Sequence, residues 1–218
     1  MDIEHNLQHI KSQLPEHVTL VAVSKTKPVS AILEAYNSGQ RIFGENKIQE
    51  MAEKYEQLPK DIEWHMIGHV QRNKVKYMAH FVDLIHGVDN LKLLREINKQ
   101  AEKHDRVIKC LLQIKIAEED SKFGMPPEDA LKLLQDEAFK ELKHIAIVGV
   151  MGMATFTNDE AQIKTEFSCL KTTFDKLNAF QPMEIISMGM SGDYPLAIEC
   201  GSTMVRVGSS IFGERNYL

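Results

Sequence analysis

A lysine follows the first apolar run of the chain. Residues 18–23 read Val-Thr-Leu-Val-Ala-Val, and one serine separates this run from Lys25. An apolar run of this length predicts a buried strand, and a charged amine is costly to desolvate beside it. Lys25 therefore either reaches the surface where the strand stops or supplies the reactive amine of a site. The run alone leaves both interpretations open.

Two glycine- and serine-containing segments near the carboxyl end have the composition of an anion site. They are Gly189-Met190-Ser191-Gly192 and Gly208-Ser209-Ser210, and each follows an apolar run. Glycine lets the backbone approach a ligand closely, and N–H groups at the start of a helix attract negative charge. These segments predict a site for a phosphate-bearing ligand.

Arg206 lies inside the last apolar run, two residues before Gly208. Alternation along a strand turns Met204, Arg206 and Gly208 to one face and the two intervening valines to the other. A buried arginine is costly unless a ligand or a carboxylate meets it. Arg206 is therefore a second ligand-binding candidate, or else it pairs with a buried glutamate such as Glu199.

The elements that must position these residues are short apolar runs alternating with segments of helical periodicity. The predicted strands are Thr19–Val23, Arg41–Phe43, Trp64–Ile67, Leu84–His86, Ile108–Ile114, Ala146–Gly149, Ile185–Ser187 and Met204–Val207. The predicted helices between them include Ile32–Tyr36, Lys47–Leu58, Lys74–Phe81, Leu91–His104, Ala130–Phe139 and Glu160–Leu177.

Eight strands that alternate with helices predict an α/β fold, either a doubly wound sheet or a (β/α)8 barrel of the TIM type. The count of eight favours the barrel, in which reactive groups sit at the carboxyl ends of the strands. Residues 1–218 are predicted to form one domain. Apolar residues at Ile3, Leu7, Ile10 and Leu14 add an amphipathic helix at the amino terminus, packed outside the barrel.

Composition narrows the class of protein. The formal net charge of the 218 residues is −5, which argues against a nucleic-acid binder that neutralises phosphates. Three cysteines without a CxxC pair suggest a reducing compartment. The polar amino terminus resembles neither a signal peptide nor a membrane span, so we expect a cytoplasmic protein. No metal site is predicted, because no HExxH spacing occurs.

An amine that converges with a phosphate site indicates an aldehyde ligand held as a Schiff base. In that arrangement the lysine attacks a carbonyl group while the phosphate anchors the rest of the molecule. Pyridoxal 5′-phosphate (PLP) is the common cofactor of this form. Barrel aldolases also combine a lysine with a phosphate site, but their lysine usually lies on a middle strand.

Five segments in this order resemble the pyridoxal phosphate homeostasis protein family, from about Leu7 to Tyr217. This family is single-domain and similar to the barrel domain of alanine racemase. The segments are AVSKTKP at 22–28, FGENKIQE at 43–50, EWHMIG at 63–68, SMGMSGDYPLAI at 187–198 and GSTMVRVGSSIFGER at 201–215.

The resemblance implies a role for individual residues. Lys25 corresponds to the lysine that holds PLP as a Schiff base, and Asn46 to a pocket asparagine near the cofactor ring. Arg206 corresponds to an arginine that faces the pyridine nitrogen. A guanidinium keeps its charge and donates to that nitrogen, so the ring is a weaker electron sink than it is beside a carboxylate.

The resemblance also implies the phosphate-binding positions, namely Ser191, Gly208 and Ser209. Three other side chains are left open by the sequence. Lys27 is either a secondary aldehyde acceptor or a solvated loop lysine. His65 either faces the pocket or is a hydrogen-bonded core histidine, and His69 either contacts the ligand or is solvated.

The resemblance implies a protein that binds PLP without robust catalysis, contributes to intracellular vitamin B6 homeostasis, and buffers the cofactor or delivers it to apo-enzymes. No catalytic residue is predicted. The chain ends a few residues after the eighth strand, without room for the domain that supplies the second base of alanine racemase. Without that domain we expect a monomer. Two alternatives are a racemase-like enzyme that uses Lys25 as its only base, and an aldolase-like barrel acting on a phosphosugar.

Overall fold

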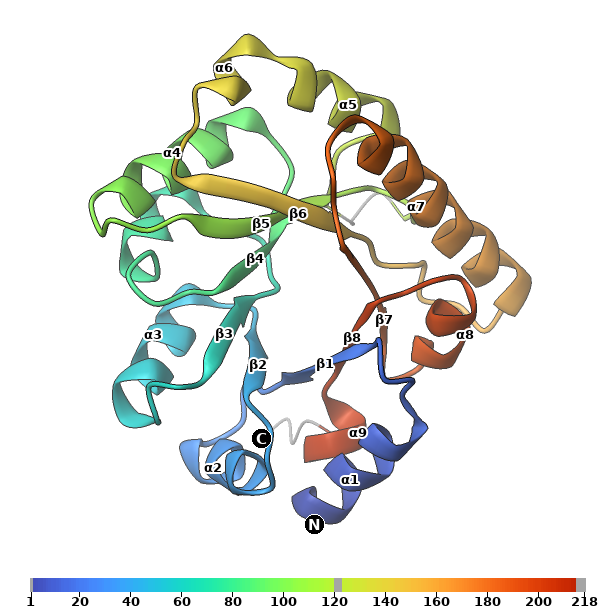
Figure 1. Ribbon diagram of the computed structural model, residues 1–218. Coiled ribbons are helices and arrows are strands. Elements are labelled where there is room, and N and C mark those ends of the chain that lie inside the picture. Colours follow the sequence, from blue (N-terminus) through green and yellow to red (C-terminus); the bar gives the residue numbers. More distant parts are fainter. Residues whose placement is uncertain (1, 120–122, 215–218) are drawn as a thin grey trace.

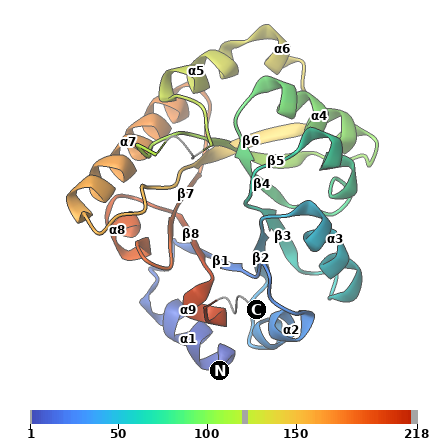
Figure 2. The ribbon, with the colours of Figure 1, turned by 180° about the vertical axis from the view of Figure 1, so that it is seen from behind.

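The strands form one closed parallel barrel in chain order (Figures 1 and 2). The computed structural model describes residues 2–119 and 123–214. The strands are β1 (Thr19–Val23), β2 (Ile42–Glu45), β3 (Glu63–Met66), β4 (Leu84–Val88), β5 (Ile108–Gln113), β6 (Ile145–Met151), β7 (Ile185–Met190) and β8 (Met204–Val207). Pairing of β1 with β8, in a register that sets Val21 opposite Arg206, closes the sheet. The eight predicted strands and the barrel are confirmed, and the doubly wound alternative is wrong.

Helices surround the barrel on its outer side (Figure 1). They are α1 (Ile3–Gln13), α2 (Val29–Asn37), α3 (Ile48–Gln57), η1 (Arg72–Tyr77), α4 (Leu91–Glu102), α5 (Pro127–Gln135), α6 (Glu137–Lys140), α7 (Glu160–Phe180), α8 (Tyr194–Glu199) and α9 (Ser209–Phe212). Within the parts of the chain that the structure describes, no helix is long and apolar enough to cross a membrane.

Two predicted helices differ in detail from the observed ones. The segment predicted over 74–81 is a 3-10 helix, η1, whose N–H groups bond three residues back, as Lys74 does to the carbonyl of Gln71. The helix predicted over 130–139 breaks at Asp136. The Asp136 carboxylate accepts from the N–H of Ala138 over 2.8 Å, so it starts a new helix where α5 ends.

The predicted amino-terminal helix is confirmed as α1, outside the barrel and beside α9 (Figure 1). Its apolar side chains Ile3, Leu7 and Ile10 are buried. Asp2 caps the helix by accepting from the N–H of His5 over 2.8 Å. The helix therefore packs against α9, which follows the last strand.

Apolar side chains form two layers on either side of the sheet. The large outer layer lies between strands and helices and includes Val205 and Val207. A small inner layer fills the barrel and comprises Val21, Leu84, Leu111, Met151 and Met204. Because Arg206 alternates with the two outer valines, its side chain enters the barrel from the same face as Met204, as the sequence predicts.

Candidate functional site

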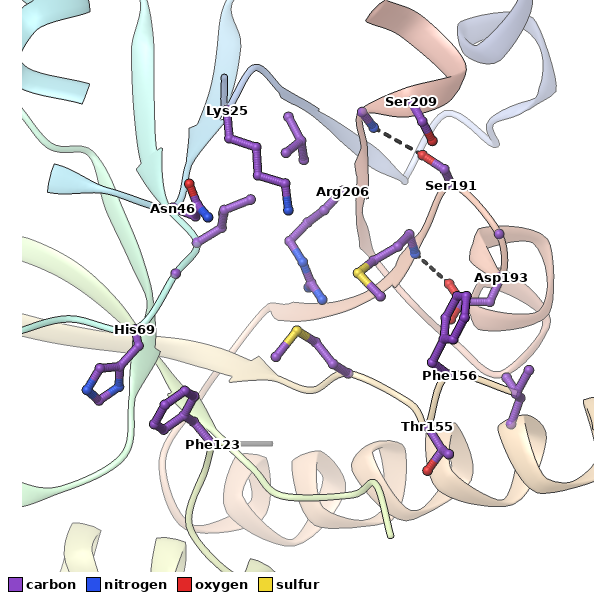
Figure 3. A pocket seen from close by; sticks show the side chains of 18 of the residues that line it. Lys25, Asn46, His69, Phe123, Thr155, Phe156, Ser191, Asp193, Arg206 and Ser209 are labelled. Atoms are coloured by element: carbon purple, nitrogen blue, oxygen red, sulfur yellow. Dashed lines mark hydrogen bonds between the residues drawn. The ribbon is translucent and has the colours of Figure 1, made fainter. Parts of the chain in front are cut away.

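A cavity of about 680 Å³ opens at the carboxyl ends of the strands. All six residues predicted as a site line it: Lys25, Asn46, Ser191, Arg206, Gly208 and Ser209. Figure 3 shows Lys25, Asn46, Ser191, Arg206 and Ser209 around the same space, to which they come from segments that are far apart in the sequence. The rule that strand ends share one rim therefore predicts correctly that these residues line one cavity, while their role in binding a ligand stays a prediction.

Lys25 enters this cavity from the loop after β1. Its side chain points toward the guanidinium of Arg206 in Figure 3, and it is only partly exposed. The preceding residue, Ser24, is fully buried. The following residue, Thr26, has a φ of +63°, in the left-handed region that β-branched residues avoid. A tightly constrained backbone thus presents the amine to the cavity.

The loops after β7 and β8 meet beside the amine. The hydroxyl of Ser191 accepts from the N–H of Gly208 over 3.2 Å, which ties the two loops together. A Cβ atom on Gly208 would lie 3.1 Å from the carbonyl oxygen of Val23, so glycine is what fits against β1. Gly208 precedes α9, whose first N–H groups have no acceptor within the helix. These groups suit an anion such as a phosphate.

The guanidinium of Arg206 is buried beneath this cradle, with 4% of the residue exposed. Nη1 donates to Oγ of Ser187 over 2.6 Å, and Nη2 donates to the carbonyl of Gly152 over 3.1 Å. Burial lowers the pKa of Arg206 to about 10, although the Asp193 carboxylate opposes the change. The guanidinium therefore stays charged at neutral pH and is held by neutral acceptors.

The alternative pairing of Arg206 with Glu199 is wrong. Glu199 lies at the exposed end of α8 and forms an ion pair with Lys164 at 2.9 Å. Glu199 belongs to a helix on the outer side of the sheet, whereas Arg206 points into the barrel. The sequence shows that residue 199 is a glutamate, but residue type alone does not predict whether it lies inside or outside the barrel.

Two polar residues that the sequence reasoning missed extend the Arg206 contacts across the barrel. Ser187 Oγ also lies 3.0 Å from Nδ1 of His86, and His86 Nε2 lies 3.0 Å from Nδ1 of His65. Burial lowers the pKa of His65 to about 3 and that of His86 well below its usual value. Both imidazoles are therefore neutral. The available signal was strand alternation: His86 shares the inner face of Leu84 on β4, and His65 is next to the outward-facing Trp64 on β3, so both histidines point inward.

His65 is thus a hydrogen-bonded core histidine, the interpretation that the sequence left open beside a pocket role. His69 lies at the rim, lines the cavity and stacks on Phe123 with ring centroids 4.2 Å apart. Lys27 also lines the cavity, but its Nζ donates to the carbonyls of Phe212 and Gly213 over 2.9 and 3.0 Å. Lys27 therefore caps the carboxyl end of α9 and is not a solvated loop lysine.

The side chain of Asn46 indicates which kind of ligand the cavity can bind. Its Oδ1 atom is buried and has no hydrogen-bond partner within the described chain. An unpaired buried carbonyl oxygen is costly, so the position suits a ligand that offers a donor. Together with the amine, the anion cradle and the guanidinium, Asn46 fits a small phosphorylated ligand with a polar ring.

Other chemistries find less support in the same region. Across residues 2–119 and 123–214, no three His, Cys, Asp or Glu side chains are placed to hold a metal ion. The residues described around the cavity include no tyrosine. Arg215 and Tyr217, where the similar segments end, lie outside the described residues.

Comparison with known proteins first defines the class. Residues 1–216 match the model of the family described as "Alanine racemase, N-terminal domain". An alanine racemase of Clostridium difficile 630 superimposes with a TM-score of 0.80 at 16% identity, covering 99% of this chain and 56% of that one. At this identity the likeness shows the fold alone.

Closer relatives define the family within this class. The pyridoxal phosphate homeostasis protein of Haemophilus influenzae is 39% identical over 233 residues, which cover 100% of this chain and 98% of the relative. That of Escherichia coli K12 is 35% identical over 237 residues, with coverage of 99% and 98%. The chain belongs to the pyridoxal phosphate homeostasis protein family.

A solved relative is also similar over its whole length. PipY of Synechococcus elongatus PCC7942, in its structure without PLP, superimposes with a TM-score of 0.91 at 36% identity. The structure of PipY with PLP bound gives a TM-score of 0.88 at 35% identity. In both comparisons the match covers 97% of this chain and 100% of PipY.

Proposed function

We propose that this protein binds PLP as a Schiff base with Lys25 and holds it for intracellular vitamin B6 homeostasis. The observation that carries the proposal is the convergence of Lys25, Arg206 and the loop pair Ser191–Gly208 on one cavity. Similarity to PipY, of which a structure has PLP bound, supports it. The orphaned Oδ1 of Asn46 supports it independently.

Each lining residue has a distinct task in this proposal. Gly208 and Ser209 at the start of α9, together with Ser191 in the loop after β7, bind the phosphate through backbone N–H groups and hydroxyls. Arg206 donates to the pyridine nitrogen and, by keeping its own charge, disfavours protonation of that nitrogen. Asn46 lies beside the ring. When bound, the cofactor supplies an aldehyde with which the Lys25 amine condenses, with loss of one water.

We infer a carrier and not an enzyme. Racemisation with two bases needs a proton acceptor on each face of the cofactor, and no tyrosine lines the described part of the cavity opposite Lys25. A guanidinium at the ring nitrogen also weakens the carbanion chemistry that PLP enzymes drive. In this proposal a cytoplasmic monomer buffers the reactive aldehyde and delivers it to apo forms of PLP-dependent enzymes.

Spectroscopy of the purified protein tests the proposal. Addition of PLP should give an absorbance band of the Schiff base, which borohydride reduction fixes onto the peptide that contains Lys25. Lys25→Ala should abolish the band, whereas Lys132→Ala, at an exposed ion pair on α5, should leave it intact. Protein that stays colourless with PLP would refute the proposal.

Deuterium exchange separates the carrier from the racemase-like alternative. A carrier should exchange the α-hydrogen of amino acids no faster than free PLP does. Exchange well above that rate, and its loss in Lys25→Ala, would instead support an enzyme with Lys25 as its base. An aldolase-like barrel would bind phosphosugars and give no visible band with PLP.

A further inference from the structure

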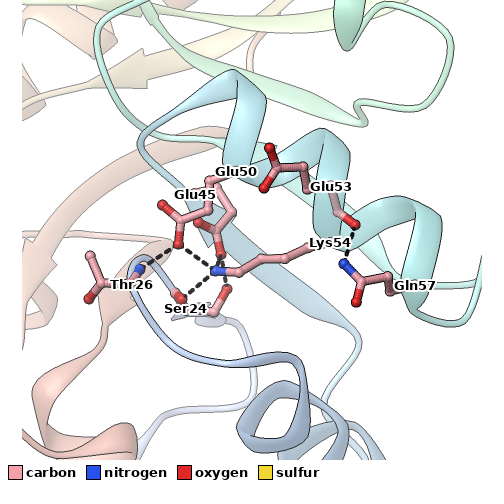
Figure 4. A network of polar contacts seen from close by, with 7 residues as sticks. All are labelled: Ser24, Thr26, Glu45, Glu50, Glu53, Lys54 and Gln57. Atoms are coloured by element: carbon pink, nitrogen blue, oxygen red, sulfur yellow. Dashed lines mark hydrogen bonds and ion pairs between the residues drawn. The ribbon is translucent and has the colours of Figure 1, made fainter.

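The buried ammonium of Lys54 has all of its donors satisfied on the outer side of the barrel. Nζ donates to the carbonyl of Ser24 over 2.8 Å, to Oε1 of Glu45 over 2.7 Å and to Oε1 of Glu50 over 2.7 Å. An ammonium has three N–H donors, so these three acceptors use all of them. Figure 4 shows this group with Thr26 beside it, and we call the five residues the Lys54 cluster.

The Lys54 cluster holds both peptide groups that flank Lys25. The carbonyl of Ser24 belongs to the peptide before Lys25, and it accepts directly from Lys54. The N–H of Thr26 belongs to the peptide after Lys25, and it donates to Oε1 of Glu50 over 2.6 Å. Since Glu50 is itself bound to Lys54, one ammonium anchors the backbone on both sides of Lys25.

The backbone from Ser24 to Lys27 adopts a conformation that its surroundings must hold. Thr26 has a φ of +63°, and a β-branched residue adopts that conformation only where its surroundings impose it. The side chain of Thr26 is exposed, so packing does not impose it. Two hydrogen bonds hold the turn: the N–H of Lys27 donates to the carbonyl of Ser24 over 3.0 Å, and the N–H of Thr26 donates to Glu50. Both acceptors are members of the Lys54 cluster.

Stability alone is a poor explanation for the cluster. Removing charges from water is expensive, and apolar residues of similar volume often stabilise a protein as well or better. Lys54 is 5% exposed and Glu45 is fully buried, and the second carboxylate oxygen of Glu45 has no partner in the described chain. Burial also raises the pKa of Glu45. Because this costly charged group is bonded to the backbone that flanks Lys25, we infer that it serves to position Lys25.

We propose that Lys54 is a positioning residue: by holding the backbone on both sides of Lys25, it fixes the position and orientation of the Lys25 amine in the cavity. The inference rests on the proposed binding of PLP. The lone pair of the neutral Lys25 amine must add to the aldehyde carbon, after which the aldehyde oxygen leaves as water and a C=N bond remains. A misplacement of about 1 Å in such a reaction costs about 100-fold in rate.

The test separates bond formation from occupancy of the cavity. Pyridoxine 5′-phosphate carries a hydroxymethyl group in place of the aldehyde, so it binds without reacting with Lys25. In Lys54→Met, the Schiff-base band should develop at least about tenfold more slowly after mixing with PLP. The dissociation constant of pyridoxine 5′-phosphate should change less than about twofold, and Lys54→Arg should restore part of the rate.

A matched control is available on α7. Lys171 bonds Asp175 over 2.6 Å with the same four-residue spacing that joins Glu50 to Lys54, but both side chains are exposed. Lys171→Met should change neither the rate nor the dissociation constant. This control separates the effect of losing the bonds to the backbone around Lys25 from the effect of losing an ion pair on a helix.

A milder variant keeps the proposal testable if Lys54→Met does not fold. Glu50→Ala removes the acceptor of the Thr26 N–H but leaves the bonds from Lys54 to Ser24 and Glu45. It should slow the band and leave pyridoxine 5′-phosphate binding unchanged. A wild-type rate in Glu50→Ala, or a parallel loss of pyridoxine 5′-phosphate binding, would overturn the positioning role. If the wild type forms no band, the proposed function fails as well, so the two failures are distinguishable.

Discussion

Arg206 and Ser187 are joined by a 2.6 Å hydrogen bond at one end of a chain of polar groups across the barrel. The Ser187 hydroxyl, which accepts from the guanidinium, also lies 3.0 Å from Nδ1 of His86. His86 Nε2 in turn lies 3.0 Å from Nδ1 of His65. The contacts of the cavity arginine thus continue to two neutral histidines beneath it.

We predict that Ser187→Ala weakens PLP binding about tenfold. The substitution removes the acceptor of Nη1, and a hydrogen bond to a charged group contributes about 1.5–3 kcal/mol, of which 1.4 kcal/mol corresponds to tenfold. Arg206 would keep its contact with Gly152 but lose its fixed orientation. Titration of the absorbance band measures the change. Ser12→Ala, at an exposed serine of α1, is the control, and equal affinities of the two variants would contradict the prediction.

Acid should destabilise the protein through the buried histidines. The pKa of His65 is about 3 in the folded protein, against an ordinary value of 6.5, and that of His86 is lowered as well. Below pH 6.5 the unfolded chain therefore binds more protons than the folded chain. The contribution is complete above pH 6.5 and is lost progressively as the pH falls toward 3.

A variant isolates the share of His65 in this pH dependence. Each such histidine contributes a slope of about 1.4 kcal/mol per pH unit to the free energy of unfolding. His65→Gln keeps a hydrogen-bonding side chain beside His86 but does not titrate, so its slope between pH 5 and 6 should be smaller by about this amount. Urea denaturation at several pH values provides the measurement. Identical slopes in both proteins would show that His65 is already protonated in the fold.

The fold was predictable from the sequence because parallel strands buried on both faces leave apolar runs. Each of the eight runs coincides with a strand, and the strand ends identified the cavity residues. Register was not predictable, and it decides which polar groups meet inside the barrel. Ser187 pairs with Met204 and Met190 with Arg206, across an irregularity that brings the Ser187 hydroxyl to the guanidinium.

The Lys54 cluster could not be predicted from the sequence for a related reason. Lys54 lies on α3 at a helical position where a lysine normally reaches solvent, and its partner Ser24 lies 30 residues away. A lysine that folds back under a strand end has the same local pattern as a solvated one. Only the packing of α3 against β2 and β3, beside the end of β1, distinguishes the two.

Gly149→Ala should destabilise the barrel by about 3 kcal/mol, because overpacking against backbone cannot relax easily. A Cβ atom at this position would lie 1.9 Å from the carbonyl oxygen of Ile185, its partner in the β6–β7 pairing. Gly192→Ala is the matched control, since no atom lies within 4 Å of its added Cβ. Urea denaturation should show a change within about 0.5 kcal/mol for the control. Equal stability of both variants would contradict the argument.

Thr26→Gly should raise the free energy of unfolding by about 1 kcal/mol while slowing the reaction of Lys25 with PLP. A non-glycine residue in the left-handed region costs about 1–3 kcal/mol, and glycine returns about 0.5–1 kcal/mol of this through its freer unfolded chain. The Thr26 side chain is exposed, so no packing is lost. Thermal unfolding and the rate at which the Schiff-base band develops give the two readouts.

Thr26→Ala separates strain from the loss of a side chain. Alanine keeps the Cβ atom and hence much of the conformational cost, so it should gain little stability and react close to the wild-type rate. Glycine removes that cost and gives the peptide after Lys25 a freedom that the bond to Glu50 restrains only in part. A stabilised Thr26→Gly protein that reacts as fast as the wild type would show that the strained backbone serves no purpose in presenting Lys25.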